Sequence, residues 1–125
     1  MEDDRPWPEP AEHLLLTRRW KYAPPPWVMY EAIVNDGTEW LRAVGGESQP
    51  VVVASRRPDA VLLRPWLDSA VTAVELGLQP DGHGAAMTVL AYGAAPLPDE
   101  VRRRIRHRLG VVFGEMLRRW VDEPR

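Results

Sequence analysis

The stretch Pro98–Val121, PDEVRRRIRHRLGVVFGEMLRRWV, decides the fold of this chain. Its apolar residues recur at three- and four-residue steps, so they fill one broad arc of a helix that turns by about 100° per residue. Pro98 suits the first helical turn, and Asp99 and Glu100 complement the helix dipole there. We therefore predict one long amphipathic helix, whose apolar face consists of Val101, Ile105, Leu109, Val112, Phe113, Met116, Leu117, Trp120 and Val121.

Two glycines, Gly110 and Gly114, lie one turn apart at the edge of this apolar arc. Glycine inside a helix costs about 1 kcal/mol relative to alanine, so a helix with two glycines indicates a close approach to its backbone. One interpretation is that a ligand or the sheet makes this approach. The other is close packing of small residues.

Every predicted strand lies upstream of the long helix. A first alternating segment, Leu14–Tyr22, ends at three prolines that also suit the start of a helix. Two short helices are expected next, Trp27–Val34 and a second one capped by Thr38 that carries Trp40 and ends before Gly45. Four further strands separated by short turns complete an antiparallel sheet in an α+β fold: Val51–Ser55, Ala60–Trp66, Val71–Leu78 and Ala85–Tyr92, the last two joined by a turn over Gln79–Gly84.

Length and composition limit the classes of function. The 125 residues fit one domain, which we place at 13–123, after an acidic, proline-rich arm at 1–12 that is expected to be disordered. The absence of cysteine excludes disulfides and thiolate chemistry. No apolar run is long enough to span a bilayer, and no signal peptide precedes the domain, so we expect a cytoplasmic protein. A net charge of −2 argues against nucleic acid as a partner, although contacts from the arginine-rich helix to phosphates are an alternative.

Three stretches resemble the START-like ligand-binding superfamily, also called SRPBCC. They are YAPPPWVMYEAIVNDGTEWL at Tyr22–Leu41, RPDAVLLRPWLDSAVTAVELGLQPDGHG at Arg57–Gly84, and the helix Leu109–Trp120. Their order and spacing are similar to the branch named after activators of the heat-shock-protein ATPase and to polyketide-cyclase-like proteins. The resemblance implies a helix-grip fold, in which a curved antiparallel sheet wraps around a long C-terminal helix and a pocket lies between them.

The sequence departs from the family between Gly46 and Arg57, where the family has room for two or three strands and this chain has room for about one. The cavity is then smaller, or a second subunit completes it. The resemblance implies no universal catalytic set, so no catalytic residue is carried over. The histidines His13, His83 and His107 lack the spacing of a zinc site, and we expect no metal or cofactor.

Candidate ligand-binding residues follow from the resemblance and from the helix periodicity. The resemblance points Met87, Val89 and Ala91 inward, together with Thr72, Val74 and Leu76 of the preceding strand. The helical angle places Arg102 and Arg106 inside the apolar arc, where a guanidinium can pair with an acidic ligand group; the alternative is a solvated first turn. The candidate site is Trp40, Trp66, Met87, Val89, Arg106, Gly110, Phe113 and Gly114, and plain core packing is the alternative for the apolar members.

We therefore expect the protein to bind a small hydrophobic or amphipathic ligand between the sheet and the terminal helix. One alternative is a cyclase- or aromatase-like enzyme that positions a polyketide-type substrate; whether the protein is an enzyme stays open. Another is a protein-interaction module of the co-chaperone type. Leu90 and Tyr92 would face away from the pocket, which leaves a homodimer through the outer sheet face open.

Overall fold

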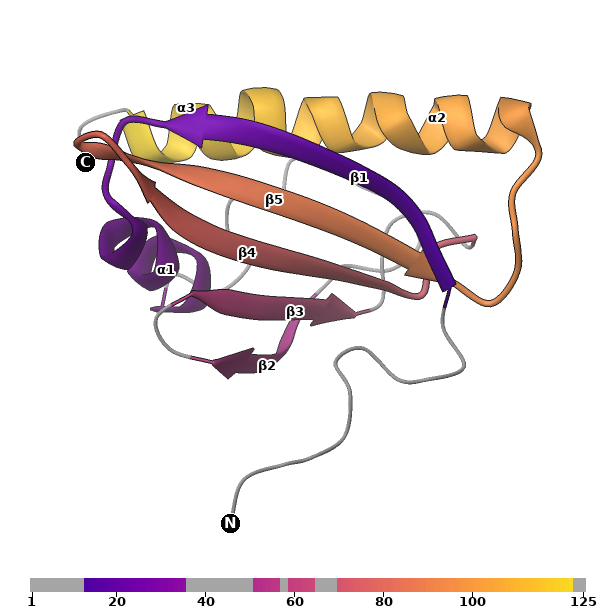
Figure 1. Cartoon of the computed structure of the whole chain (residues 1–125), viewed down its shortest axis with the longest axis horizontal. Helices are drawn as coiled ribbons and strands as arrows, with labels where there is room; N and C mark the ends of the chain where they lie inside the picture. The colour runs from indigo at the N-terminus through magenta and orange to yellow at the C-terminus, as the bar shows by residue number, and fades with distance from the viewer. Residues whose placement is uncertain (1–12, 36–50, 57–58, 65–69, 123–125) are drawn as a thin grey trace, which may run out of the picture.

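The computed structural model describes residues 13–35, 51–56, 59–64 and 70–122. The predicted arm at 1–12, the second short helix, Trp40 and Trp66 lie outside the described residues. The described chain forms a curved sheet with a long helix along one side and a short helix near its other end (Figure 1). None of the helices in these ranges is long and apolar enough to cross a membrane.

The sheet has five antiparallel strands in the order β1-β5-β4-β3-β2. The first strand therefore pairs with the last, and it forms one edge of the sheet. The antiparallel sheet predicted from alternation is confirmed, and β2 is the strand that occupies the shortened interval. The strands are β1 His13–Tyr22, β2 Val51–Arg56, β3 Ala60–Arg64, β4 Ala73–Asp81 and β5 Gly84–Gly93.

The turn between β4 and β5 is shorter than predicted. We expected a turn over Gln79–Gly84, but the ladder continues to the pair Asp81↔Gly84. Only Gly82 and His83 form the turn, and Gly82 adopts a φ of 61°. A two-residue hairpin turn needs such a positive φ, which glycine adopts without strain. The strands therefore extend through residues whose composition alone is typical of a loop.

Alternation along β4 and β5 gives the sheet an inner face toward the helix and an outer face. Val74, Leu76, Met87, Val89 and Ala91 are fully buried on the inner face, in the orientation that the family resemblance implied. The outer face carries Glu75, Leu90 and Tyr92, all half-buried. There the Tyr92 hydroxyl donates to Glu75 Oε1 at 3.4 Å.

The short helix α1 spans Pro26–Asn35, close to the predicted Trp27–Val34. The three prolines end β1 and open this helix, as predicted: the amides of Val28 and Met29 donate to the Pro25 carbonyl at 3.0 and 3.1 Å. Met29 and Ile33 are fully buried, and α1 packs against β3, β4 and β5. The helix thus closes one end of the core.

The C-terminal helix is continuous but changes its hydrogen-bonding pattern. It consists of α2 Asp99–Leu109, the π-helical segment η2 Gly110–Met116 and α3 Leu117–Asp122. We predicted its extent and buried face but not the π-helical turns, in which the Leu117 amide donates to the Val112 carbonyl. Its fully buried residues are Ile105, Leu109, Val112, Phe113 and Leu117.

A buried hydrogen bond joins β1 to the π-helical segment. The Tyr22 hydroxyl donates to the Phe113 carbonyl oxygen at 2.6 Å. Burial raises the pKa of Tyr22 above its usual range, against the opposing effect of the nearby Arg118 guanidinium. Because a π-helical turn has poorer backbone hydrogen bonding than an α-helical turn, the hydroxyl offsets part of its cost.

Two arginines also fasten the helix to the edge strand. Arg102 Nη1 donates to the Leu15 carbonyl at 3.0 Å, and Arg118 Nη2 donates to the Lys21 carbonyl at 2.9 Å. Leu15 lies at a register shift in the pairing of β1 with β5, so its backbone is displaced from the regular ladder. The hypothesis that Arg102 faces a ligand cavity is therefore corrected: its guanidinium is half-buried against the strand.

We expect Tyr22→Phe to lower the free energy of unfolding by about 1–3 kcal/mol, because the buried Phe113 carbonyl loses its hydroxyl donor. Urea denaturation at pH 7 measures the difference. A Tyr22→Phe protein as stable as the wild type would contradict the structural role of this hydrogen bond.

The raised pKa of Tyr22 leads us to predict that the protein loses stability in alkaline solution. Tyrosine in the unfolded chain ionises near about pH 10, whereas folded Tyr22 keeps its proton to higher pH. Above about pH 10 the unfolded state then binds fewer protons than the folded state, so the free energy of unfolding falls as pH rises. Urea denaturation from pH 8 to 11 tests this, and Tyr22→Phe should show a shallower decline; parallel declines would refute it.

Candidate functional site

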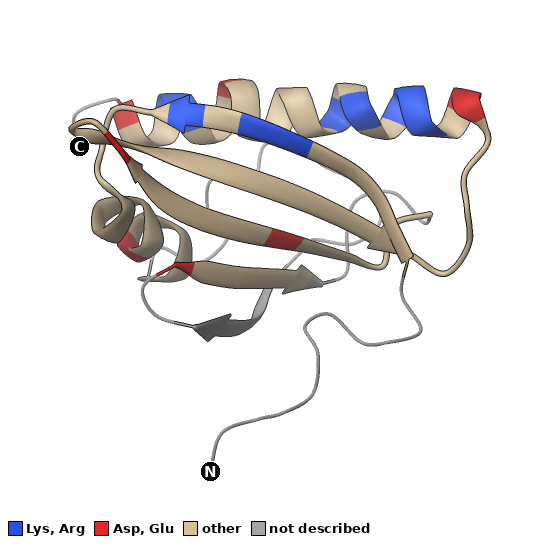
Figure 2. Ribbon diagram, viewed as in Figure 1, with Lys and Arg blue, Asp and Glu red and all other residues tan. Residues whose placement is uncertain are grey.

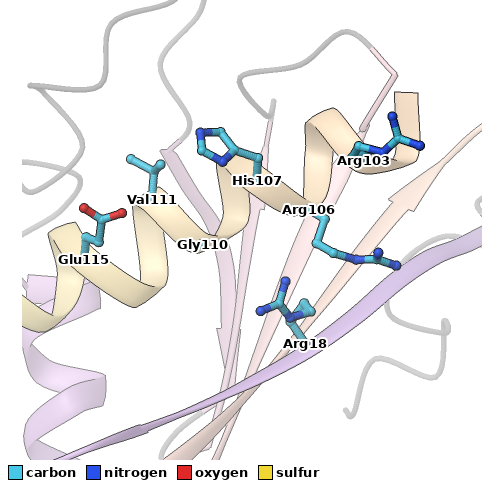
Figure 3. Close-up of a pocket in the computed structure, with 7 residues that line it drawn as sticks. All are labelled: Arg18, Arg103, Arg106, His107, Gly110, Val111 and Glu115. Atoms are coloured by element: carbon cyan, nitrogen blue, oxygen red, sulfur yellow. The ribbon is translucent and has the colours of Figure 1, made fainter. Parts of the chain in front are cut away.

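A groove of about 360 Å³ lies between β1 and the C-terminal helix. Arg18 projects from β1 toward the helix, and Arg106 projects from the helix toward β1 (Figure 3). Gly110 leaves one wall open, because a Cβ built there meets nothing within 4 Å. The groove is lined by Arg18, Arg103, Arg106, His107, Gly110, Val111 and Glu115.

The groove is rich in positive charge that the described chain does not neutralise. Figure 2 shows basic residues on β1 and on the neighbouring part of α2. Within the described ranges, Arg18, Arg103 and Arg106 have no carboxylate partner. Glu115 is the one carboxylate in the lining and is exposed. Guanidinium groups brought together without counter-ions favour the binding of an anion.

Stacked aromatic rings connect this groove to the core. The Arg18 guanidinium lies over the Trp20 ring, 5.0 Å from its centroid. The Trp20 ring in turn packs against Phe113, with centroids 6.0 Å apart and planes at 37°. Phe113 is fully buried, Trp20 is half-buried, and Arg18 is half-buried at the groove. The stack therefore links Arg18, which lines the groove, to the buried core.

The sheet register places two of the predicted site residues beside this stack. Val89 pairs directly with Arg18, and Met87 pairs directly with Trp20. Directly paired residues in antiparallel strands point to the same face, so their side chains are neighbours. Met87, Val89 and Phe113 are all fully buried in the core cluster, and their role as ligand contacts stays a prediction.

The structure brings part of the predicted site together. Arg106 and Gly110 line the same groove, although Arg106 is exposed rather than inside the apolar arc. Trp40 and Trp66 lie outside the described residues. Sequence reasoning missed Arg18 and Trp20, although their signal was present: both alternate in phase with Leu16 and Tyr22 along β1.

The two helix glycines play different roles. At Gly114 an added Cβ would lie 3.0 Å from Trp20 Nε1 and 3.6 Å from Trp20 Cδ1, so this glycine lets the indole pack against the helix backbone. Gly110 faces the groove instead. The predicted close approach therefore occurs at Gly114, and the sheet makes it.

The glycine pair gives a matched test. Gly110→Ala should raise the free energy of unfolding by about 0.5–1 kcal/mol, since alanine favours the helix and its methyl group meets open space. Gly114→Ala should leave the protein less stable than Gly110→Ala does, because the added methyl group lies 3.0 Å from Trp20 Nε1 and the indole must move by a few tenths of an ångström to accommodate it. Urea denaturation of both variants decides; equal effects would contradict the different roles.

The described residues bring no metal-binding set together. No group of three or more His, Cys, Asp or Glu residues suited to a metal ion occurs among them. Three tyrosines are partly or fully buried. Tyr92 hydrogen bonds to Glu75 on the outer face, Tyr30 is buried in α1, and Tyr22 donates its hydroxyl proton to the Phe113 carbonyl.

Comparison with known proteins identifies the fold. No family model and no curated protein sequence matches this chain. The crystal structure of Ara h 8.0201 superposes with a TM-score of 0.60 at 17% identity, covering 88% of this chain and 97% of the other. The chain has the helix-grip fold of this structure.

A second solved structure has the same fold. CalU16 from Micromonospora echinospora superposes with a TM-score of 0.58 at 13% identity, covering 87% of this chain and 75% of the other. The curved antiparallel sheet and the long C-terminal helix are the features expected from the START-like resemblance, and both are confirmed.

Proposed function

We propose that this protein binds a small amphipathic molecule between β1 and the C-terminal helix, with an acidic group of that molecule held by Arg106. The observation that supports this most directly is the meeting of Arg18 and Arg106 across a groove without a carboxylate partner in the described chain. Its volume of about 360 Å³ falls in the range of small-molecule sites.

The apolar part of the ligand would lie against Val111 and the open side of Gly110, which line the groove together with the arginines. Trp20, which is half-buried, contacts Arg18 on one side and Phe113 on the other, and it pairs with Met87. A shift of the indole would open contact between the groove and these apolar residues, which gives Met87, Val89 and Phe113 their proposed role.

Ligand binding is supported over the other two functions by the groove itself. An enzyme of the cyclase type needs an acid or base at the site, and the described lining offers only His107 and Glu115, both exposed. A protein-interaction module needs no groove with converging arginines. The similarity to CalU16 extends to the fold alone, so no reaction is carried over from it.

Native mass spectrometry of the purified protein, alone and with decanoate, tests this proposal. We expect a one-to-one complex with wild-type protein. Gly110→Leu should abolish it by filling the groove, and Arg106→Ala should weaken it about tenfold or more, as for loss of a charge-assisted hydrogen bond.

Arg119→Ala is the matched control, because Arg119 is also an exposed helix arginine but does not line the groove. It should bind decanoate as the wild type does. A ligand-free dimer that does not take up decanoate would reject the proposal in favour of an interaction module. Equal weakening by Arg119→Ala and Arg106→Ala would show nonspecific charge attraction.

A further inference from the structure

We infer that the acidic group held in the groove is a phosphate monoester, a dianion bound jointly by Arg18 and Arg106. This inference rests on the proposed function and specifies its ligand class. The two arginines come from different elements, the edge strand and the helix, and both line the same groove (Figure 3).

The charge of the lining favours a dianion over a monoanion. Arg18, Arg103 and Arg106 supply three positive charges, and Glu115 supplies one negative charge, so the lining carries two net positive charges with His107 neutral. A carboxylate or a sulfate ester brings one negative charge and leaves one positive charge unbalanced. A phosphate monoester brings nearly two at neutral pH.

The placement of the donors on two separate elements favours a tetrahedral group. A carboxylate presents two oxygens in one plane, which one guanidinium fork can occupy fully. A phosphate monoester presents three terminal oxygens that point in different directions. Donors on β1 and on α2 can then each bind a separate edge of the same group.

Two other arginines lie along the seam, the line of contact between β1 and the C-terminal helix, and both are already hydrogen bonded to β1. Arg102 and Arg118 donate to the carbonyls of Leu15 and Lys21, so their forks hold the helix on the strand. The Arg18 guanidinium makes no hydrogen bond within the described chain and lies over the Trp20 ring. The Arg106 guanidinium makes none there either. These two side chains therefore keep their donors for a ligand.

The test compares decyl phosphate, decyl sulfate, decanoate and inorganic phosphate by isothermal titration calorimetry at pH 8, where the monoester is a dianion. Decyl phosphate should bind about tenfold tighter than decyl sulfate, which has the same chain and a tetrahedral head with one charge. The preference should shrink as ionic strength rises.

Arg18→Gln and Arg106→Gln should each remove most of this preference, and Arg119→Gln should leave it unchanged. Because Arg18 also contacts Trp20, the decanol affinity and urea denaturation of Arg18→Gln are measured alongside. Decanol binding and stability close to wild type would assign the loss to the phosphate contact.

The outcomes separate this inference from the proposed function. Equal affinities for decyl phosphate, decyl sulfate and decanoate would overturn the phosphate inference and leave amphipathic binding standing. Inorganic phosphate binding as tightly as decyl phosphate would support the phosphate site and overturn the amphipathic function. No binding of any of these probes would overturn both.

Discussion

The attachment of the C-terminal helix to the edge strand β1 is the interaction on which the rest of the structure depends. Tyr22 is hydrogen bonded to the Phe113 carbonyl in the middle of the helix, and Arg102 and Arg118 are hydrogen bonded to β1 carbonyls on either side. The helix segment between the two arginines is about 24 Å long at 1.5 Å per residue. The matching strand segment, Leu15 to Lys21, spans about 20 Å at 3.3 Å per residue, so both attachments form while the helix follows the strand (Figure 1).

The groove is the part of this seam that the attachments leave unfilled. Trp20 occupies the middle of the seam because Gly114 gives it access to the helix backbone. Beside it, Gly110 provides no side chain, and Arg18 and Arg106 both carry a positive charge, so they do not close the gap by pairing with each other. The attachment of the C-terminal helix to β1 therefore holds the helix in place and also leaves the charged groove open beside Trp20.

Much of the architecture was predictable because it depends on local periodicity. The three- and four-residue steps from Val101 to Val121 define the helix and its buried face, and alternation defines the strands. The π-helical turns were not predictable in this way, because the hydroxyl that supports them comes from Tyr22, 91 residues away along the chain. Local composition also misled at Gln79–Gly84, where strand pairing overrides loop-like residues.

The candidate site could likewise be predicted from the sequence only in part. The helical angle alone treated Arg102 and Arg106 alike, yet the position of the edge strand gives Arg102 a carbonyl and leaves Arg106 exposed in the groove. Arg18 was not recognised because a single arginine in an alternating strand has no meaning until the helix opposite is known. A site built from side chains on distant elements requires the tertiary structure.

The pairing of the earliest described strand with the last helix also sets the order of events during synthesis. The hydrogen bonds across the seam join residues 87, 91 and 97 positions apart. At about 5–20 residues per second, the ribosome needs roughly 5–20 s to make the chain between the two partners. For most of that interval the apolar inner face of β1 lacks β5, and for all of it the face lacks the complete helix. The contact between β1 and the C-terminal helix is therefore completed only after residue 118 has been made.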